Sequence, residues 1–441
     1  MSRRNLLLLL LAIAFSYACY LRGEQNPYAR YAAEGLATIH RDSLDALPSS
    51  ELFDGAMRGM VDVLHQHGDE HSQYFDEAEA NPLRSEIHQQ FGGIGVRIGL
   101  VGAQHRLAIV APPEPGSPAA SANIEAGDFI IKIDDRSTGG MKINDASRLL
   151  RGEPGTIVRL SLEHPPDLQP RMVQLKRGVI NAESVIGDRR DSNGNWQFRL
   201  GEDPRIAQVR ITSFGDHTAA EFEHVIRKLI HDGVRAIVLD LRENPGGSLD
   251  AAVAVCKTLL PAGKTIVETR GRGQVLLHRY ASTSNGPFVD LPMAVVVNQY
   301  SASAAEIVAA CLQDNGRAVV VGQRSYGKGT VQQLLPLESG KSLLKLTWAS
   351  FWRPSGMNIQ RTPGALDNAI WGVMPDSGFE YKLSPQEYKA YQTYREKRDG
   401  ISQIEAATGS EAYALSKSTS FVDTQLQLAV KYLSGKPGDN P

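Results

Sequence analysis

The chain has 441 residues, 42% of them hydrophobic, which is long enough for two or three globular domains. Its 47 basic and 49 acidic residues leave a formal net charge of −2, which excludes a strongly basic nucleic-acid-binding protein. Cys19, Cys256 and Cys311 lie too far apart to form a disulfide framework or a set of metal ligands. Cys256 and Cys311 sit in apolar, helix-like runs, which predicts buried thiols.

Residues 1–23 read as a signal sequence or a membrane anchor. Arg3-Arg4 precedes an apolar run over 6–20, which is short for a membrane span and long for the core of a simple signal peptide. Ser16-Tyr17-Ala18 is a tolerable cleavage site, so removal of the segment and its retention as an anchor both remain open. Either alternative predicts an exported protein, periplasmic or otherwise extracytoplasmic.

Residues 24–90 are predicted to form a helical N-terminal region. Apolar side chains recur at near-helical spacing, for example at Leu52, Met57, Val61 and Leu64. The histidine-rich stretch over 65–71 matches no common zinc-ligand spacing, so it is interpreted as a solvated helix end and no metal site is predicted there.

A separate domain is predicted over residues 91–178. Three glycines pack among apolar residues in Phe91-Gly92-Gly93-Ile94-Gly95-Val96, and the segment Ser117-Pro118-Ala119-Ala120 follows and leads toward a strand over 129–133. This segment resembles a PDZ domain. A glycine-rich turn of this kind offers several N–H groups to one carboxylate, so Gly92, Gly93, Ile94 and Gly95 are candidate ligands of a peptide's terminal carboxylate. The alternative is an ordinary turn in a small β domain.

Residues 179–380 are predicted to form an α/β layer with parallel strands. Apolar runs at 206–211, 236–241, 295–297 and 318–321 alternate with helix-like segments starting at 218, 249 and 304. The loop Asn244-Pro245-Gly246-Gly247 and the loop before Ser303 both follow strand ends, where sheets of this type place their sites.

Ser303 and Lys328 are the candidate catalytic pair. Ser303 falls at the entrance of a helix, and Lys328 lies between glycines in Tyr326-Gly327-Lys328-Gly329. A buried lysine can lose its charge and then accept the serine proton. The alternative is structural: Ser303-Ala304-Ala305-Glu306 also matches a capping box, which would make Ser303 a helix cap and Lys328 a loop residue in water.

Residues 381–441 are predicted to form a C-terminal helical segment and a tail. The amphipathic stretch over 421–433 is compatible with core packing and with dimerisation, and the two remain open. Residues 436–441 read as a solvated tail.

Ordered motifs identify a family. From about residue 50 to 376, and again near the C-terminus, the chain resembles the C-terminal processing peptidases, also called tail-specific proteases. The resemblance is carried by FGGIGV at 91–96, DLRENPGG at 240–247, SASAAE at 301–306, GRAVVVGQRSYGKGTVQ ending at Gln332, LKLTWASFWRPSG at 344–356, GVMPD at 372–376 and DTQLQLAVKYL at 423–433.

The resemblance implies a multidomain α/β and β protein, with a PDZ domain inserted between the helical N-terminal region and a crotonase-like α/β peptidase core. It implies Ser303 as nucleophile, Lys328 as general base and Gln332 as the residue that orients the lysine. The oxyanion would be held by the backbone N–H groups of Ala304 and of Gly246, with Gly247 as the second choice. No metal or organic cofactor is implied.

The implied activity is that of a serine endopeptidase that recognises exported polypeptides by apolar C-terminal tails. The PDZ domain would hold the tail carboxylate and gate the site, by inhibition or by activation. Asn298-Gln299-Tyr300 and Ala305 depart from the usual family pattern, which bears on substrate shape. The rival interpretation is a catalytically silent PDZ-type binding or scaffold protein at the membrane. An activator or adaptor protein and a homodimer are further partners left open.

Overall fold

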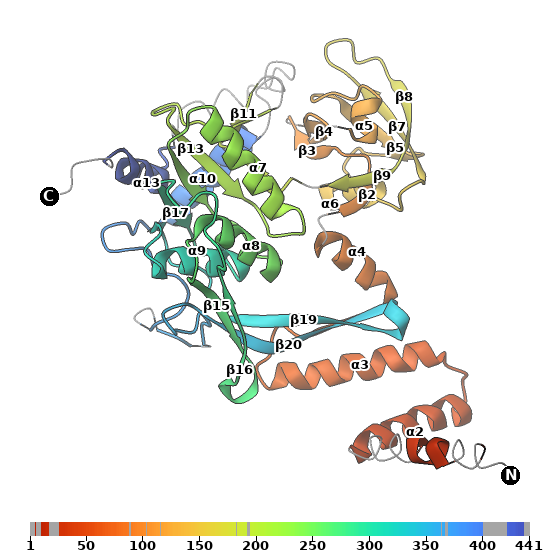
Figure 1. Cartoon of the computed structure of the whole chain (residues 1–441). Helices are drawn as coiled ribbons and strands as arrows, with labels where there is room; N and C mark the ends of the chain where they lie inside the picture. The colour runs from red at the N-terminus through yellow and green to blue at the C-terminus, as the bar shows by residue number, and fades with distance from the viewer. Residues whose placement is uncertain are drawn as a thin grey trace. The chain divides into compact units, whose positions relative to one another are not determined.

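The structure is a computed structural model that describes residues 5, 10–16, 26–87, 90–102, 104–114, 116–181, 183–191, 195–362, 364–366, 369–399 and 421–435. The chain divides into two compact units, Met1–Ala80 with Gln332–Thr347, and Asn81–Val331 with Trp348–Pro441 (Figure 1). Most of the targeting segment over 1–23 and the tail over 436–441 lie outside the described residues. Within the described part of the chain, no helix is both long enough and apolar enough to span a membrane.

The first unit is built on two helices and a strand. Helices α2 (Pro27–Asp42) and α3 (Ser49–Gln66) are followed by β1 (Gln73–Phe75), which pairs antiparallel with residues 343–345 of β20 (Ser342–Trp352). The helical spacing seen in the sequence places Met57 and Val61 on the buried face of α3, where they pack with Tyr74. Strand β19 (Thr330–Leu337) pairs with β20, and η2 (Glu338–Gly340) joins the two.

The second unit begins with α4 (Glu77–Ile87), whose first residues belong to the first unit, and continues into a small β domain. Its sheet has the order β3-β4-β5-β7-β8, with β6 on β5, and β2 pairs separately with β9. Leu107, Ile130 and Leu160 lie in its core. The bounds are β2 Gln90–Gly93, β3 Arg97–Val101, β4 Arg106–Ala111, α5 Pro118–Ser121, β5 Phe129–Ile133, β6 Arg136–Ser137, α6 Ile143–Leu150, β7 Ile157–Glu163, β8 Arg171–Lys176 and β9 Gly178–Asn181.

A mostly parallel sheet follows, as the alternation of strands and helices predicted. Its order is β10-β13-β14-β17-β18, in which β10 (Val185–Ile186) is antiparallel to β13 (Ile206–Ile211). Strands β14 (Ala236–Asp240), β17 (Met293–Val297) and β18 (Val319–Gly322) continue the parallel pairing. Every residue of β14 and β17 is buried, as expected for strands covered on both faces.

One face of this sheet is covered by α7 (Thr218–His231), α8 (Leu249–Leu259) and α9 (Ala304–Asp314) (Figure 1). Because strand side chains alternate between faces, Ile237 and Val295 point into this layer. Cys256 on α8 and Cys311 on α9 are free, fully buried thiols in the same core, which confirms the prediction.

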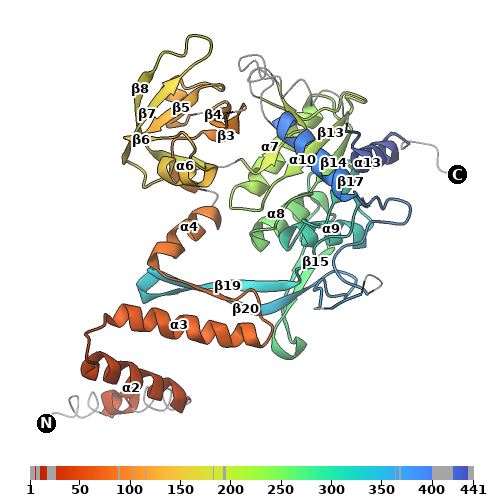
Figure 2. The same ribbon diagram turned by 180° about the vertical axis from the view of Figure 1, so that it is seen from behind.

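The opposite face is covered by α13 (Thr424–Ser434), which lies beside β14 and β17 (Figure 2). Leu426, Ala429 and Leu433 of α13 pack on Val238 and Val296. The amphipathic stretch over 421–433 therefore packs in the core of its own chain, one of the two alternatives that the sequence left open.

The remaining elements surround the sheet. Strand β15 (Thr265–Arg270) pairs with β16 (Leu276–Ala281) and with residues 350–352 of β20. The other bounds are β11 Arg189–Arg190, β12 Trp196–Gln197, η1 Arg272–Gln274 and α10 Pro385–Asp399.

Candidate active site

Ser303 is the N-cap residue of α9, in the loop that follows β17. Its backbone lies in a sparsely populated region, with φ 55° and ψ −115°. Strained non-glycine conformations of this kind persist only where neighbouring contacts fix them, and they cluster at functional sites. The side chain is half-buried. Ser303 therefore stands at a helix N-terminus, where the N–H groups of the first turn lack intrahelical acceptors.

The carboxylate of Glu306 fixes this loop. Its Oε2 accepts hydrogen bonds from the backbone N–H of Ser303 at 2.9 Å and of Lys328 at 2.8 Å. Its Oε1 accepts from the Ser325 hydroxyl and the Gly327 N–H, both at 2.6 Å. The side chain is completely buried. One carboxylate thus holds together the two loops that carry Ser303 and Lys328.

The ionisation of Glu306 reflects this environment. Burial raises the pKa of the carboxyl above its usual range, while the four hydrogen bonds oppose that rise because they stabilise the carboxylate. From the sequence, Glu306 is predicted only to complete a capping box. The S-x-x-E pattern was the available signal, but it does not reveal the bonds to 325–328.

The glycines beside Lys328 are required by close contacts. A Cβ on Gly327 would lie 2.8 Å from Cβ of Arg361, and one on Gly329 would lie 2.3 Å from the backbone nitrogen of Gln360. Gly327 also has φ +88°, which favours glycine. Residues 358–361 therefore pack directly against the loop over 326–329, the lysine loop, and fix its path. This is the close approach of the backbone that the two glycines predicted.

The two glycines of the 244–247 loop have different neighbours. A Cβ on Gly246 would lie 2.7 Å from Cβ of Ser303 and 3.0 Å from the Ala304 nitrogen, whereas one on Gly247 would lie 2.0 Å from the Phe214 oxygen. Gly246 therefore packs against the candidate nucleophile. Its own N–H donates to Oδ1 of Asn244 at 2.8 Å.

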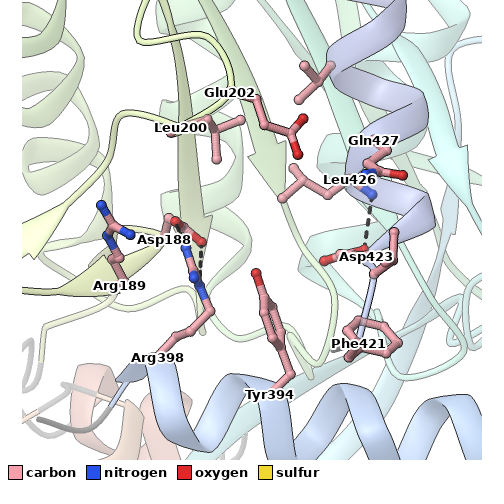
Figure 3. A pocket seen from close by; sticks show the side chains of 13 residues that line it. Asp188, Arg189, Leu200, Glu202, Tyr394, Arg398, Phe421, Asp423, Leu426 and Gln427 are labelled. Carbon is pink, nitrogen blue, oxygen red and sulfur yellow. Dashed lines mark hydrogen bonds and ion pairs between the residues drawn. The ribbon is translucent and has the colours of Figure 1, made fainter. Parts of the chain in front are cut away.

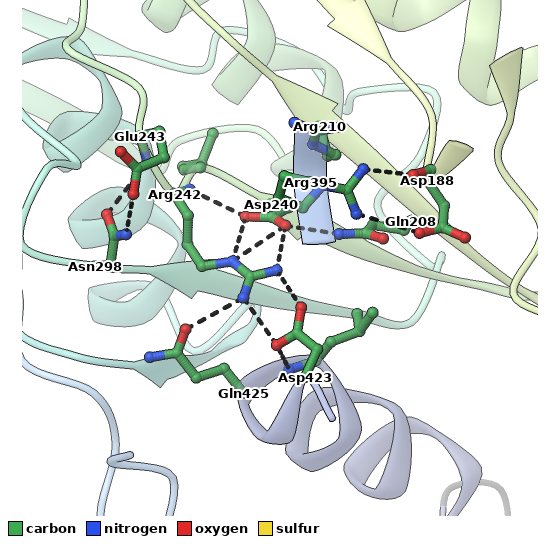
Figure 4. Close-up of polar contacts among 12 residues, drawn as sticks. Asp188, Gln208, Arg210, Asp240, Arg242, Glu243, Asn298, Arg395, Asp423 and Gln425 are labelled. Atoms are coloured by element: carbon green, nitrogen blue, oxygen red, sulfur yellow. Dashed lines mark hydrogen bonds and ion pairs between the residues drawn. The ribbon is translucent and has the colours of Figure 1, made fainter. Parts of the chain in front are cut away.

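The 244–247 loop is anchored by a buried ion network just before it (Figure 4). The Arg242 guanidinium donates to Asp240 at 2.7 Å and to both carboxylate oxygens of Asp423, the N-cap residue of α13, at 2.9 Å. Its side chain is completely buried. Although burial alone would raise the pKa of Asp240, the charge and hydrogen bonds of Arg242 lower it to about 2. The sequence does not predict this network, because Asp423 is distant from Asp240 and Arg242 along the chain.

Gln332 belongs to the first unit. Its Nε2 donates to the Thr347 hydroxyl at 3.3 Å, and this hydroxyl donates to Oδ1 of Asp69 at 2.9 Å. Asp69 also accepts from Ser72, through both its hydroxyl and its N–H. The side chain of Gln332 is thus bonded to a fixed partner within its own unit.

The candidate carboxylate-binding turn lies beside helix α6. Gly93, Ile94 and Gly95 line a cavity of about 70 Å³, together with Ser147 of α6 and Arg151, which follows that helix. Gly92 lies outside this lining, and a Cβ on it would lie 1.9 Å from the Gly152 oxygen. The sequence-predicted turn therefore faces a small space between a strand and a helix.

A separate cavity of about 310 Å³ lies between β11, α10 and α13 (Figure 3). Two of its carboxylates have partners within the lining: Arg398 donates to Asp188, and Asp423 accepts from the Leu426 N–H. Because these are structural contacts, the cavity is not interpreted as part of the active site.

Comparison with known proteins identifies the family of the chain. The family model "Peptidase family S41" matches residues 205–377, and the model "PDZ domain" matches residues 109–163. The chain is 32% identical to a carboxy-terminal-processing protease of Bartonella bacilliformis over 437 residues, covering 96% of this chain and 93% of the relative.

Two further relatives are more distant. Carboxy-terminal processing protease CtpA of Bacillus subtilis is 32% identical over 326 residues, covering 73% of this chain and 65% of the relative. The solved structure of a photosystem II D1 C-terminal processing protease is 26% identical, covers 80% of this chain and 86% of its own, and has a TM-score of 0.43. On the strength of the sequence matches, the chain belongs to peptidase family S41, among the carboxy-terminal-processing serine proteases.

Proposed function

We propose that this serine protease is an endopeptidase with a Ser303/Lys328 dyad, acting on exported polypeptides that it recognises by their C-terminal tails. The observation that carries the proposal is the shared carboxylate of Glu306, which bonds the backbone of both residues. Burying the Glu306 carboxylate completely costs desolvation energy. A helix cap needs only its bond to the Ser303 N–H, so the three further bonds, to residues 325–328, indicate that Glu306 also holds the loop of Lys328 in place.

The chemistry follows from the dyad. The Ser303 hydroxyl attacks the scissile carbonyl while the neutral Lys328 amine takes its proton. The resulting ammonium protonates the leaving amine, and water then hydrolyses the acyl-enzyme by the same route. In this proposal Gln332 orients Lys328, as the family resemblance implies. Because only the neutral amine accepts a proton, activity should rise with pH.

The oxyanion would be held by backbone donors on either side of Ser303. Ala304 is the first residue of α9, and its N–H has no acceptor within the helix. In the 244–247 loop, Gly246 lies closer to Ser303, but Asn244 already accepts its N–H. Both Gly246 and Gly247 therefore stay candidate donors to the oxyanion. The absence of a side chain on Gly246 leaves room beside Ser303.

The proposal also gives roles to the parts of the chain outside the peptidase core. The turn at Gly92, Gly93, Ile94 and Gly95 would bind the tail carboxylate, and residues 1–23 would direct export or attach the protein to a membrane. An activator or adaptor and a homodimer remain part of the hypothesis. The proposed domains are 24–90, 91–178, 179–380 and 381–441.

The test uses the full-length chain with an unfolded protein that carries an apolar C-terminal tail. Wild type should cleave it, and the Ser303→Ala and Lys328→Ala variants should bind it without cleavage. Lys228→Ala, a change on the exposed surface of α7, is the matched control and should cleave normally. Amidation of the tail should weaken cleavage by wild type.

Cleavage by Lys328→Ala at the wild-type rate would overturn the dyad. Equal binding by all variants without any cleavage would favour the rival interpretation, a PDZ-type binding protein.

A further inference from the structure

A further cavity, of about 370 Å³, lies beside the loop that carries Lys328. It is lined by Tyr326, two residues before Lys328, and by Gln299, which follows β17. The Tyr326 N–H donates to the Ser301 oxygen at 3.0 Å, so the cavity borders both chain segments of the proposed dyad.

The wall of this cavity is joined directly to the residue before Lys328. The Arg361 N–H donates to the Gly327 oxygen at 2.8 Å. A Cβ on Gly327 would lie 2.8 Å from Cβ of Arg361 and 2.9 Å from the ring of Trp371. A substrate group in the cavity would therefore lie next to the lysine loop.

The cavity is rich in positive charge. Its lining includes Arg324, Arg361 and Lys382, opposed by the carboxylate of Glu380. Among the described residues, none of these three cations forms an ion pair within 4.0 Å, although elsewhere arginines such as Arg242 and Arg353 are paired. A polypeptide carboxylate is the group that would complete this set.

Trp371 fixes the two guanidinium groups. The Arg324 and Arg361 guanidinium carbons lie 4.4 and 4.7 Å from the centroid of its ring. Arg324 also donates to the Ala369 oxygen at 3.3 Å. Nε of Arg324 donates to the sulfur of Met374, which also lines the cavity, so Nη2 is the Arg324 nitrogen that would bind an anion. Stacking on the ring orients this group and the Arg361 guanidinium for in-plane hydrogen bonds.

We propose that this cavity is a substrate subsite that binds a carboxylate of the polypeptide through Arg324 and Arg361. The carboxylate is either an aspartate or glutamate side chain near the scissile bond or the terminal α-carboxylate. The subsite is separate from the glycine-rich turn of the PDZ domain, and the inference rests on the proposed peptidase function.

The test measures kcat/KM of the full-length protein on matched peptides that carry Glu, Gln or Lys at successive positions around one scissile bond. Each peptide is made with a free and with an amidated C-terminus. Wild type should favour Glu over Gln by about tenfold at one position, or the free over the amidated terminus by a similar factor. The first comparison reports a side-chain carboxylate. Because the PDZ turn is also proposed to bind the tail carboxylate, the second comparison counts for this subsite only as far as the amidation effect is lost in the arginine variants.

The variants Arg361→Gln and Arg324→Gln should reduce this preference to about twofold or less, and Arg361→Glu should shift it toward Lys. Arg361 is exposed, so its substitution leaves the core intact. Lys228→Gln should keep the wild-type preference. The subsite is overturned if Arg361→Glu changes neither the Glu-over-Gln ratio nor the free-over-amidated ratio, or if wild type shows no preference at any position.

Binding separates this proposal from the peptidase function. Calorimetric titration of the Ser303→Ala variant with the same peptides should show the same charge preference. If wild type cleaves no peptide but the charge preference in binding is present and is lost in Arg361→Glu, the subsite stands and the peptidase function fails. Cleavage with no charge preference in either assay rejects the subsite alone.

Discussion

The backbone N–H groups of Ser303 and Lys328 meet at one atom, Oε2 of Glu306, at 2.9 and 2.8 Å. The buried Glu306 carboxylate thus fixes the backbone of both loops, while Ser303 and Lys328 are half-buried and remain partly accessible. This relationship makes Glu306 the residue on which the geometry of the proposed dyad depends.

Glu306→Gln should lower kcat by about a hundredfold, because an amide nitrogen replaces one acceptor and leaves buried N–H groups unpaired. The melting temperature should also fall. The matched control is Glu387→Gln, in which an S-x-x-E cap on α10 is changed: its carboxylate accepts from the Ser384 N–H at 2.8 Å. Kinetics and thermal melts of both variants provide the check, and an unchanged kcat in Glu306→Gln would contradict the positioning role.

Gly246→Ala should lower kcat/KM by about a hundredfold or more, since the new Cβ would lie 2.7 Å from Cβ of Ser303 and the backbone has φ +104°. Gly201→Ala is the control, because a Cβ there meets no described atom within 4 Å. Steady-state kinetics with a fluorogenic peptide measure both. Normal activity of Gly246→Ala would show that the loop shifts away from Ser303 at little cost.

Thr347→Val should lower kcat by about tenfold with little change in KM, because the Gln332 amide loses the hydroxyl to which it donates at 3.3 Å. Asp69 keeps its bonds from Ser72, so the fold should be nearly unaffected. Thr393→Val is the control, because the Thr393 hydroxyl is exposed on α10 and donates only to the Lys389 oxygen of the same helix, at 3.2 Å, among the bonds of the described residues. The pH dependence of kcat should also change if Gln332 orients the lysine. Identical pH profiles for Thr347→Val and wild type would argue against that role.

Asp423→Ala should reduce the free energy of unfolding by about 3 kcal/mol, because it removes one carboxylate from the buried Arg242 and the N-cap of α13. The control is Asp203→Ala, which breaks an exposed pair with Arg205. Chemical denaturation measures both variants. Stability equal to that of wild type would mean that α13 does not depend on this contact.

Acid should weaken the same network. The pKa of Asp240 is lowered from 3.8 to about 2 in the folded protein, so its stabilising contribution is present above about pH 4 and is lost as the pH falls toward 2. A shift of this size corresponds to about 2 kcal/mol. The difference in unfolding free energy between wild type and Asp240→Asn should therefore shrink between pH 5 and pH 2. A difference independent of pH over this interval would contradict the assignment.

The sequence by itself determined the fold class, the parallel strands and the positions of Ser303 and the two glycine loops. These features follow from local patterns: hydrophobic periodicity selects strands and helices, and glycine marks close approach of the backbone. The β-rich segment from residue 91 was also identifiable, because alternating strands and a glycine-rich turn lie close together in the chain.

Tertiary structure decided the rest. The four donors that meet at Glu306 come from two loops, and the Arg242 network joins a strand end to a helix near the C-terminus. The stretch over 421–433 has an apolar face that suits a partner or a core equally well. It became part of the core because it packs on Val238 and Val296, on the apolar face of β14 and β17 opposite α7, α8 and α9. Such contacts join residues far apart in sequence, and the packing of the whole domain brings them together. They could not be predicted from the sequence, because they produce no local periodicity in it.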